Sequence, residues 1–461
     1  MIIRDVRRVA MVLVPVFILL YGSFILLNDK TFRSASTTAS WLGHSAKKII
    51  KGAGGEGGSS DSKDYVLTSS PEYHELSAIS TPDGSFFAVD MMPRHAINPN
   101  IIPHPRLMDT WIVVAQSVRE DNLAAFVELV CNAAFRDGAL RCLQPAAPLP
   151  IRPTQGGHHC QGDLAYFNLN VGPHDARVLV GPKRPFVVFG SNSVYTCFGQ
   201  FIQDLDALVE HEWGGVTGGD GGDYRVATEL QRPGPWNSVE KNWFPFWDSK
   251  DELYVHYDIS PSRAFARVYP DGSAGPNLAV LSAASDAACM RRYMPALGDA
   301  AQGEPRSRSR SQSLHQATNS LRVTMCERRG SPCTPDDDNT YIFAIYQHKT
   351  FHNLHAVYEP FVLMFRQVPP FDMVAMSRTP LWIRGRHMNA AREVSEMLYV
   401  TSISWKSGSG TGGGNGVADG NGYHGYLDDE MFIAFGIEDE RTGAIDVLAK
   451  DVLGDIALCG L

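Results

Sequence analysis

Short runs rich in β-branched and aromatic residues recur between residues 105 and 450, and no other feature constrains the fold of this chain as strongly. Each run is bounded by Gly, Pro, Asp or Asn, which are typical of turns between strands. Helical spacing of apolar residues is confined to 121–134, 285–297 and 388–397. The sequence therefore predicts an all-β fold, whose clearest strands lie at 110–116, 177–190, 253–257, 264–269, 340–346, 361–366, 398–404 and 431–436.

These strands fall into about five groups, with low-complexity pieces at 214–222, 299–315 and 407–422 between them. Strand pattern resumes after each piece, so we interpret the three as surface insertions and not as linkers between domains. Propellers are built from four-stranded groups of roughly 40–50 residues. The pattern favours a β-propeller with surface insertions, with an elaborated β-sandwich as the alternative.

Residues 9–27 form an uncharged apolar run near the N-terminus. As a helix, such a run reaches roughly 28 Å, close to the hydrocarbon thickness of a bilayer. A cleavable signal peptide and a buried core helix are the alternatives, but the apolar region of a signal peptide is shorter and ends in small residues. Basic residues flank the run, namely Arg4, Arg7 and Arg8 before it and Lys47, Lys48 and Lys51 after it. The positive-inside rule, applied to the preceding arginines, predicts an uncleaved type II membrane anchor.

The chain thus divides into a cytoplasmic tail (1–8), the transmembrane signal-anchor (9–27), a flexible stem (28–70) and a lumenal domain (71–461). The stem is centred on the Gly/Ser-rich stretch 53–62, a composition typical of flexible linkers. Many Golgi transferases are displayed on such an anchor and stem. We therefore expect a single-pass protein of the secretory pathway, in the Golgi, which contacts the membrane through its anchor.

The charge and composition restrict the partners. A formal net charge of −9 argues against a nucleic-acid partner. The basic run 306–310 is flanked by polar residues, and we interpret it as part of a solvated insertion. Apolar residues make up 44% and charged residues 20%, which is ordinary for a globular domain with a large core.

Eight cysteines all follow the predicted anchor. An even number in an oxidising compartment suggests disulfides, whose pairing a sequence does not give. Neighbours in the sequence are the natural pairs, namely Cys131 with Cys142 and Cys326 with Cys333. No pair has the spacing of a metal site, and Cys160 beside His158 and His159 is an isolated cluster, so we expect no metal and no cofactor.

Three segments carry side chains suited to chemistry, and the first is 172–178, directly before a predicted strand. Asp175 and Arg177 are two residues apart, so on an extended segment they point the same way. They form either a buried pair or an acid whose pKa is tuned by a neighbouring cation. The alternative is a turn aspartate beside a solvent-facing arginine.

The second segment is 240–263, where Glu240, Lys241, Asn242 and Trp243 open an aromatic cluster that ends near Arg263. Hydrogen-bonding groups beside flat apolar rings are the combination that sugars require, because their hydroxyls need directional partners while their C–H faces stack on aromatic rings. The alternative is a surface Glu–Lys pair next to a core tryptophan.

The third segment, 424–439, contains Asp428, Asp429 and Asp439 around an apolar strand. Asp428 and Asp429 either line a pocket or flank a turn. Three histidines after the strand at 340–346 form a weaker cluster, from which His348 is the candidate for a pocket; the other two are His352 and His355.

In order, these segments resemble the five-bladed β-propeller enzymes that act on glycans. The shared elements are a Gly-x-x-Asp-x-Arg-Val segment, a Lys-Asn element before Phe-Pro, the Pro-Pro-Phe to Thr-Pro-Leu tail at 369–381 and a final strand ending Gly-x-x-Asp. Within that group the sequence is most similar to glycoside hydrolase family 130, the β-mannoside phosphorylases and hydrolases, and to related mannosyltransferases. The resemblance covers residues 105–450 and implies a five-bladed propeller.

The resemblance also implies roles. Asp175 matches the acid of that family's central pocket, and Arg177 matches the arginine of the same segment. Lys241 and Asn242 match sugar-contacting groups, with Glu240 beside them, and Asp439 matches the aspartate that closes the last blade. His174 and Ala176 replace the family's Glu and Pro, and the full set of basic residues that would bind inorganic phosphate is not identified in the sequence, which puts phosphorolysis in doubt.

The sequence thus favours a membrane-anchored enzyme that acts on glycosidic bonds, by mannosyl-type transfer to a glycan. Asp175 is the expected acid–base residue, with Glu240 as the second carboxylate and Asp204 and Asp428 behind it. Asp204-Leu205-Asp206 has the Asp-x-Asp pattern of a metal-dependent nucleotide-sugar site but not a convincing strand-end context in the sequence, so we do not expect such a site. The expected substrate-binding residues are Arg177, Lys241, Asn242, Trp243, Arg263, His348, Asp428 and Asp439. The alternatives are an anchored glycosidase and a non-catalytic propeller that binds glycans or proteins.

Overall fold

The computed structural model describes residues 73–118, 126–169, 172–209, 223–295, 312–329, 333–352, 355–389, 394–407 and 422–460. All of them belong to one unit that begins at Asp64. The predicted tail and anchor and the predicted stem to residue 70 lie outside these ranges. Within the ranges, no helix has the length and hydropathy needed to cross a membrane.

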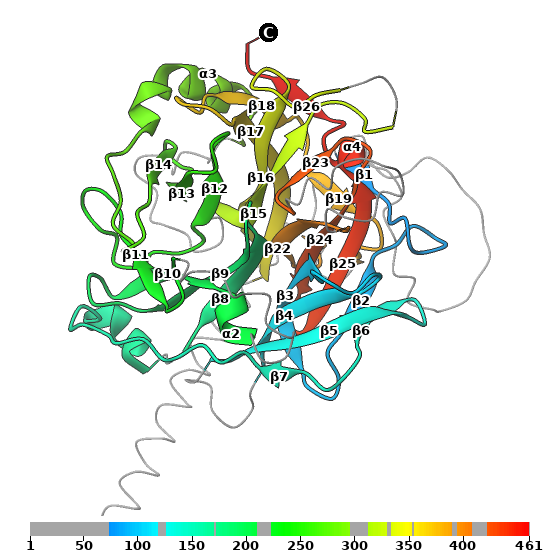
Figure 1. Cartoon of the computed structure of the whole chain (residues 1–461), viewed down its shortest axis with the longest axis horizontal. Helices are drawn as coiled ribbons and strands as arrows, with labels where there is room; N and C mark the ends of the chain where they lie inside the picture. The colour runs from blue at the N-terminus through cyan, green and yellow to red at the C-terminus, as the bar shows by residue number, and fades with distance from the viewer. Residues whose placement is uncertain are drawn as a thin grey trace, which may run out of the picture. The chain divides into compact units, whose positions relative to one another are not determined.

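The described residues are mostly β, as predicted, and their larger sheets have four, three, six and nine strands. Dividing the nine-stranded sheet at its parallel pairing gives five groups of strands, which we call blades one to five (Figure 1). Blade one contains β3 (Ala96–Pro103), β4 (Trp111–Ser117), β5 (Glu128–Arg136), β6 (Ala139–Cys142) and β7 (Ala147–Pro148). Blade two contains β8 (His174–Val180), β9 (Pro185–Asn192), β10 (Phe198–Asp204) and β11 (Thr228–Leu230). Blade three contains β12 (Phe244–Trp247), β13 (Leu253–Asp258) and β14 (Ala264–Arg267).

Blade four contains β15 (Ser313–Thr324), β16 (Thr340–His352), β17 (His355–Arg366) and β18 (Met373–Ser377), flanked by β23 (His424–Tyr426) and β26 (Ile456–Leu458). Blade five contains β22 (Leu398–Trp405), β24 (Glu430–Ile437), β25 (Arg441–Leu448) and, from the other end of the chain, β2 (Phe87–Asp90). A short parallel contact from β2 to β6 continues blade five into blade one.

Smaller elements complete the unit. Two short pairs are β1 (His74–Leu76) with β19 (Leu381–Ile383) and β20 (Met388–Asn389) with β21 (Val394–Ser395). The helices are α2 (Asp206–Val209), α3 (Ala283–Tyr293) and α4 (Ala449–Val452), and the 3-10 turns are η3 (Gly162–Leu169) and η4 (Ala279–Leu281).

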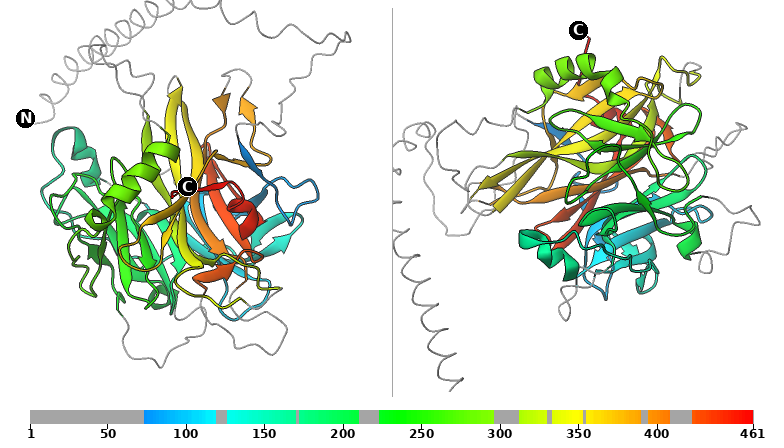
Figure 2. Two further views of the ribbon diagram at one scale, coloured as in Figure 1. Left: turned by 90° about the horizontal axis from the view of Figure 1, so that it is seen from above. Right: turned by 90° about the vertical axis from the view of Figure 1, so that its left-hand side faces the viewer.

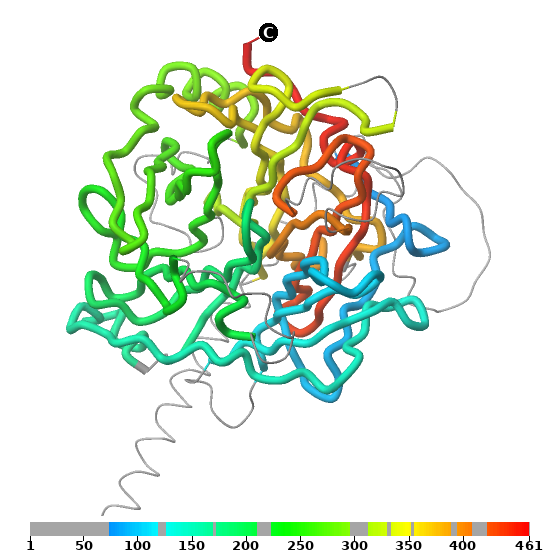
Figure 3. The backbone as a smooth tube through the Cα atoms, in the orientation of Figure 1, coloured from blue at the N-terminus to red at the C-terminus, as the bar shows by residue number. Residues whose placement is uncertain are grey.

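The first strand of each blade lies nearest the centre of the ring (Figures 1 and 3). β22 packs against β3 and β15, β3 packs against β8, and β12 packs against β15. Side-chain amides join these inner strands: Asn100 on β3 bonds the backbone of Ala176 and Val178 on β8, and Asn319 on β15 bonds the backbone of Ile403 on β22. Five blades around one centre, each built on antiparallel neighbouring strands, are the arrangement of a five-bladed β-propeller.

The hydrophobic core lies between neighbouring blades. Trp111 and Phe135 of blade one meet Phe432 of blade five, edge to face for the tryptophan. Phe246 of blade three meets Phe365 of blade four in the same way. Sheets that are covered on both faces use apolar residues at consecutive positions, which is why the strands read as continuous apolar runs.

The structure corrects three predictions about elements. Residues 121–134 do not form a helix where they are described, because 128–136 is the strand β5, buried on both faces. Residues 388–397 contain the short strands β20 and β21. The piece at 299–315 extends into β15, which begins at Ser313. The predicted helix at 285–297 is confirmed as α3, and every predicted strand run contains a strand.

Candidate active site

The N-terminal ends of the inner strands meet at one end of the ring. Asp175 is the second residue of β8, Lys241 and Asn242 precede β12, His315 is near the start of β15, and Tyr399 is near the start of β22. Each meander starts with its inner strand, so the fold brings residues from four blades to this end. Figure 2 shows the inner strands from the side.

Irregular backbone marks these strand starts. Register shifts occur at Ile97/Asn100, His174/Arg177, Gln316/Ser320 and Val400/Ser402, which are in β3, β8, β15 and β22 respectively. Bulges of this kind occur next to active sites, where they re-aim side chains. The backbone is also left-handed at Asp175 (φ 50°), Asn242 (φ 59°) and Asp439 (φ 54°). Outside glycine, Asn and Asp tolerate this conformation best, and its concentration at one place is typical of functional sites.

Asp175 lies at the centre of the polar contacts. Its Oδ2 is 3.7 Å from the Lys241 Nζ, and both side chains are about one-third exposed, at 34% and 39%. Burial raises the pKa of Asp175, but Lys241, Arg177 and His174 outweigh it, so the pKa lies below the usual value for an aspartate. Asp175 is therefore a carboxylate at neutral pH.

Arg177 holds the backbone beside the Asp175–Lys241 pair. It is buried and donates from Nε to the Ala317 carbonyl at 2.8 Å and from Nη1 to the Asp175 carbonyl at 2.9 Å. Its Nη2 also donates to the Tyr399 hydroxyl at 3.4 Å. Arg177 therefore holds the backbone of Asp175 and joins blade two to blades four and five.

Residues from blades four and five complete a group that we call the axial cluster: Asp175, Lys241, His315, Lys349, Tyr358, Tyr399 and Asp439. The Tyr358 and Tyr399 rings meet edge to face at 4.9 Å, and the Lys349 ammonium lies 5.1 Å from the Tyr358 ring centre. Four members, His315, Lys349, Tyr358 and Tyr399, were missed by the sequence reasoning. Only Tyr399 carried a signal, because it lies in a predicted strand.

The charges of the axial cluster act on one another. Burial and the negative charge of Asp175 raise the pKa of Asp439, while Lys349 opposes them. Burial, Lys349 and Lys241 lower the pKa of His315 to about 4, so this imidazole is neutral at neutral pH. The cluster thus holds one carboxylate with a lowered pKa, one with a raised pKa, and two lysines.

Two buried titratable groups lie beneath Asp175. Glu128 accepts a hydrogen bond from the Ala176 N–H, and burial raises its pKa to about 8. Burial lowers the pKa of His174 to about 4, and its ring lies 3.5 Å from the Phe126 ring, measured between centres. Burial thus disfavours the charged form of both groups, and the charge near Asp175 comes from Arg177 and the axial cluster.

A pocket adjoins the axial cluster between blades three and four. Lys241, Asn242 and His315 line it together with Asn237, Asp258 and Ser260. Its wall is built mainly of polar groups that donate or accept hydrogen bonds. The Gln316 side chain also lines it and donates from Nε2 to the Asn242 carbonyl at 3.0 Å, which fixes the left-handed turn.

Glu240 and Trp243 lie in the wall and not on its open side. The Glu240 carboxylate is buried and accepts hydrogen bonds from Arg232, the Asn237 N–H and the Trp243 indole. Trp243 is 1% exposed, so its ring face is a core surface and does not meet solvent. These contacts indicate that Glu240 and Trp243 hold the Lys241–Asn242 turn in place.

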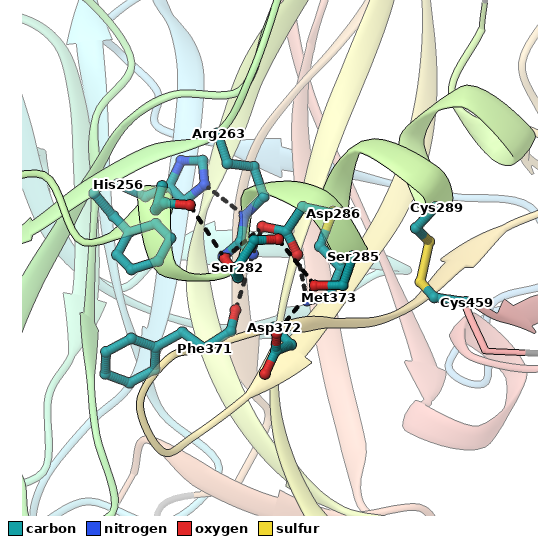
Figure 4. A network of polar contacts seen from close by, with 12 residues as sticks. His256, Arg263, Ser282, Ser285, Asp286, Cys289, Phe371, Asp372, Met373 and Cys459 are labelled. Atoms are coloured by element: carbon teal, nitrogen blue, oxygen red, sulfur yellow. Dashed lines mark hydrogen bonds and ion pairs between the residues drawn. A yellow bond between two sulfur atoms is a disulfide. The ribbon is translucent and has the colours of Figure 1, made fainter.

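Asp204 and Arg263 lie elsewhere. Asp204 is paired with Phe186 across β9 and β10, at the opposite end of blade two from His174 and Asp175, and it bonds Arg184 at 2.8 Å. Arg263 is buried and donates to Asp286 of α3 and to the Phe371 carbonyl, both at 2.9 Å (Figure 4). Neither side chain joins the axial cluster.

The remaining two candidates lie outside it as well. His348 contacts Gln312 at 3.2 Å, and burial lowers its pKa. Asp428 accepts hydrogen bonds from the N–H groups of Arg328 and Arg329, in the turn between β23 and β24. For Asp428 the turn interpretation therefore fits and the pocket interpretation does not.

All eight cysteines are paired. The expected pairs Cys131–Cys142 and Cys326–Cys333 are confirmed, and the others are Cys160–Cys197 and Cys289–Cys459. Four disulfides indicate that the chain folds in an oxidising compartment. Across the ranges that the structure describes, no three His, Cys, Asp or Glu side chains gather as a metal site would require.

Comparisons with known proteins give a fold likeness only. No family model and no curated protein matches the chain. A β-1,2-mannobiose phosphorylase from Listeria innocua is similar in structure, with a TM-score of 0.39, 9% identity, and coverage of 82% of this chain and 96% of that one. For a GDP-Man-dependent mannosyltransferase from Leishmania mexicana, the TM-score is 0.36 and the identity 9%, and the match covers 79% of this chain and 89% of that one. For an endo-arabinase from Bacteroides thetaiotaomicron, the TM-score is 0.34 and the identity 9%, and the match covers 78% of this chain and 96% of that one.

Mannoside phosphorylases of glycoside hydrolase family 130 and a mannosyltransferase are thus among the similar structures. These are the groups that the sequence motifs resemble. Since identities are near one residue in ten, an activity has to be inferred from the residues of the site.

Proposed function

We propose that this chain is an enzyme that acts on glycosidic bonds, with the axial cluster as its active site and Asp175 as its acid–base residue. The ion pair of Asp175 and Lys241 at the meeting point of the blades is the observation that carries the proposal. It combines a reactive carboxylate, neighbouring cations and strained backbone in one place, beside a polar pocket.

Glycosyl transfer from a phosphate-bearing sugar donor fits this cluster best. A carboxylate with a lowered pKa can accept the proton of an acceptor hydroxyl, which is the role of a general base. The lysines Lys241 and Lys349 can stabilise the negative charge that develops on a departing phosphate group. The proposed sugar is mannose or a related hexose, in keeping with the resemblance of the motifs.

Hydrolysis is the second candidate, and Asp439 is the residue that favours it. Its raised pKa suits an acid that protonates the glycosidic oxygen, while Asp175 activates a water molecule. Both reactions use Asp175 as the base and differ in the acceptor, and hydrolysis uses Asp439 as the acid in addition.

We propose in addition that residues 9–27 anchor the enzyme in a membrane of the secretory pathway, in the Golgi, with residues 71–461 in the lumen. The four disulfides support an oxidising compartment on that side.

The test is to incubate the full-length chain, purified in detergent, with GDP-mannose or mannose 1-phosphate and manno-oligosaccharide acceptors. Mass spectrometry then distinguishes chain extension from release of free mannose. Asp175→Asn should reduce either activity by a factor of at least about 100, which is typical for loss of a general base.

Asp428→Asn is the matched control, because Asp428 serves a turn outside the cluster; it should keep full activity. If Asp175→Asn is as active as the wild type, the assignment of Asp175 is wrong.

A further inference from the structure

Three aromatic side chains lie on segments that contact the pocket or Lys241: Tyr166 beside Phe167, Tyr195 beside Thr196 and Trp236 beside Asn237. We call them the rim aromatics. Tyr166 and Tyr195 are among the exposed large apolar side chains, at 54% and 47%, and Trp236 is partly exposed. Single exposed rings are normal on a protein surface, whereas several exposed rings beside one site indicate a binding surface.

The Tyr195 and Trp236 rings form one flat surface. They stack with centres 5.3 Å apart and planes inclined by 16°. Trp236 directly precedes Asn237, which lines the pocket with Lys241 and His315, and the Thr196 hydroxyl donates a hydrogen bond to the Asn237 carbonyl. The segments that carry the stacked pair therefore meet at a residue of the pocket wall.

Tyr166 provides a second flat surface near Lys241. It stacks on Phe167 with ring centres 4.3 Å apart, and the Lys241 ammonium lies 5.9 Å from the Phe167 ring centre and 5.3 Å from that of Phe198. Tyr166 is thus separated by one ring from the lysine that pairs with Asp175.

The segments that carry the rim aromatics are held firmly. The Ser193 hydroxyl accepts hydrogen bonds from the N–H groups of Tyr195 and Thr196, each at 3.0 Å. The Cys160–Cys197 disulfide closes the same loop, and the Asn237 N–H donates to the buried Glu240 carboxylate at 2.8 Å. Rings that are already ordered lose little entropy on binding, which is what a recognition surface needs.

We infer that the rim aromatics are subsites for further sugar units of an extended oligosaccharide whose reacting end lies in the axial cluster. Hexose rings present flat C–H faces, and the electron-rich faces of Tyr and Trp suit them. The polar pocket beside them offers Asn237, Asp258 and Ser260 to sugar hydroxyls. This inference rests on the proposed function and names its substrate class: a chain of several sugars, and not a monosaccharide or disaccharide.

The test is isothermal titration of the full-length chain carrying Asp175→Asn, with manno-oligosaccharides and xylo-oligosaccharides of two to six units. Affinity should rise with length for the matching sugar series. Tyr195→Ala and Trp236→Ala should each weaken the binding of the six-unit chain about tenfold and leave the two-unit chain unchanged, as expected when a well-placed aromatic anchor is truncated. Trp236→Phe keeps a flat ring and should retain most of the length dependence.

Tyr269→Ala is the matched control. Tyr269 is also an exposed tyrosine, at 43%, but it follows the outer end of β14, away from the axial cluster. Its loss should change no affinity. Equal affinities of the Asp175→Asn protein with and without Tyr195→Ala or Trp236→Ala for the six-unit chain, or affinity that does not grow with length, overturn the inference.

Failure of the proposed function and failure of the subsite inference give different results. If the rim variants lose the length dependence but Asp175→Asn still turns over substrate, the subsites stand and the assignment of the acid–base residue falls. If Asp175→Asn abolishes activity while no variant changes oligosaccharide binding, the active site stands and the rim aromatics have no role in recognition.

Discussion

At the scale of single residues, the axial cluster is built from side chains on unusual backbone. Asp175, Asn242 and Asp439 all have positive φ, and each is of a type that tolerates this conformation. The conformation directs the Asp175 side chain towards Lys241 while its own carbonyl accepts a bond from Arg177. A backbone conformation of this kind does not follow from strand propensity, so a sequence indicates the residue type but not the direction of its side chain.

The pH dependence of the activity should report the Asp175–Lys241 pair. Lys241 lowers the pKa of Asp175, so Lys241→Met should raise that pKa. If Asp175 must be ionised to act as a base, activity lost on acidification will then be lost at a higher pH. The measurement is the acidic limb of kcat/KM against pH for the two proteins.

Lys450→Met is the control for this change, because Lys450 pairs with Glu327 on the surface at 3.1 Å. It should leave the pH profile unchanged. An acidic limb that stays in place in Lys241→Met means that the lysine does not tune the reacting carboxylate.

Part of the site could be predicted because its residues are close in sequence to strand starts. Asp175, Arg177, Lys241 and Asn242 stood out as dense polar groups beside apolar runs, and the fold brings them together. His315, Lys349 and Tyr358 could not be found in this way. Their place at the site depends on how blade four meets blade two, which is a tertiary contact without a local signal.

At the scale of secondary-structure elements, the sequence predicts those strands that are flanked by turn residues. The segment 121–134, which contains most of β5, predicts a helix because its apolar residues recur every three or four positions. In the structure, Leu129, Val130 and Cys131 are consecutive and all buried, because β5 is covered on both faces. Burial on both sides removes the alternation that identifies a strand.

The Cys289–Cys459 disulfide joins α3 to the segment after β26, and it should contribute more to stability than Cys326–Cys333. The two bridges close loops of very different length, with sequence separations of 170 and 7. In the loop-entropy description this difference corresponds to about 3 kcal/mol. Urea unfolding of the Cys289→Ala/Cys459→Ala and Cys326→Ala/Cys333→Ala double variants measures it. Equal losses in the two proteins contradict the prediction.

At the scale of the whole described unit, one strand closes the ring. β2 pairs with β25 in blade five and with β6 in blade one. Phe87 on β2 is 2% exposed and meets Phe135 of blade one and Phe432 of blade five edge to face. This four-residue strand therefore joins the first and the last blade by backbone pairing, in addition to the packing of β22 on β3.

Phe87→Ala should destabilise the fold by about 3–5 kcal/mol, since it leaves a cavity where the two blades meet. Thermal unfolding followed by circular dichroism measures the loss. Leu107→Ala, which truncates a side chain that is 51% exposed, should change stability by less than about 0.5 kcal/mol. A small effect of Phe87→Ala would mean that blades one and five hold together without this ring.

The same closing strand has a consequence for biosynthesis. Blade five takes β2 from early in the chain and β22, β24 and β25 from its last quarter, so the ribosome must release nearly all of it before the sheet can be completed. Until then the edge of β2 that pairs with β25 has no partner, and unpaired strand edges are prone to aggregation. Such long-range pairing also makes folding slow. Production of this protein should therefore depend on chaperones that shield the early blades while translation continues.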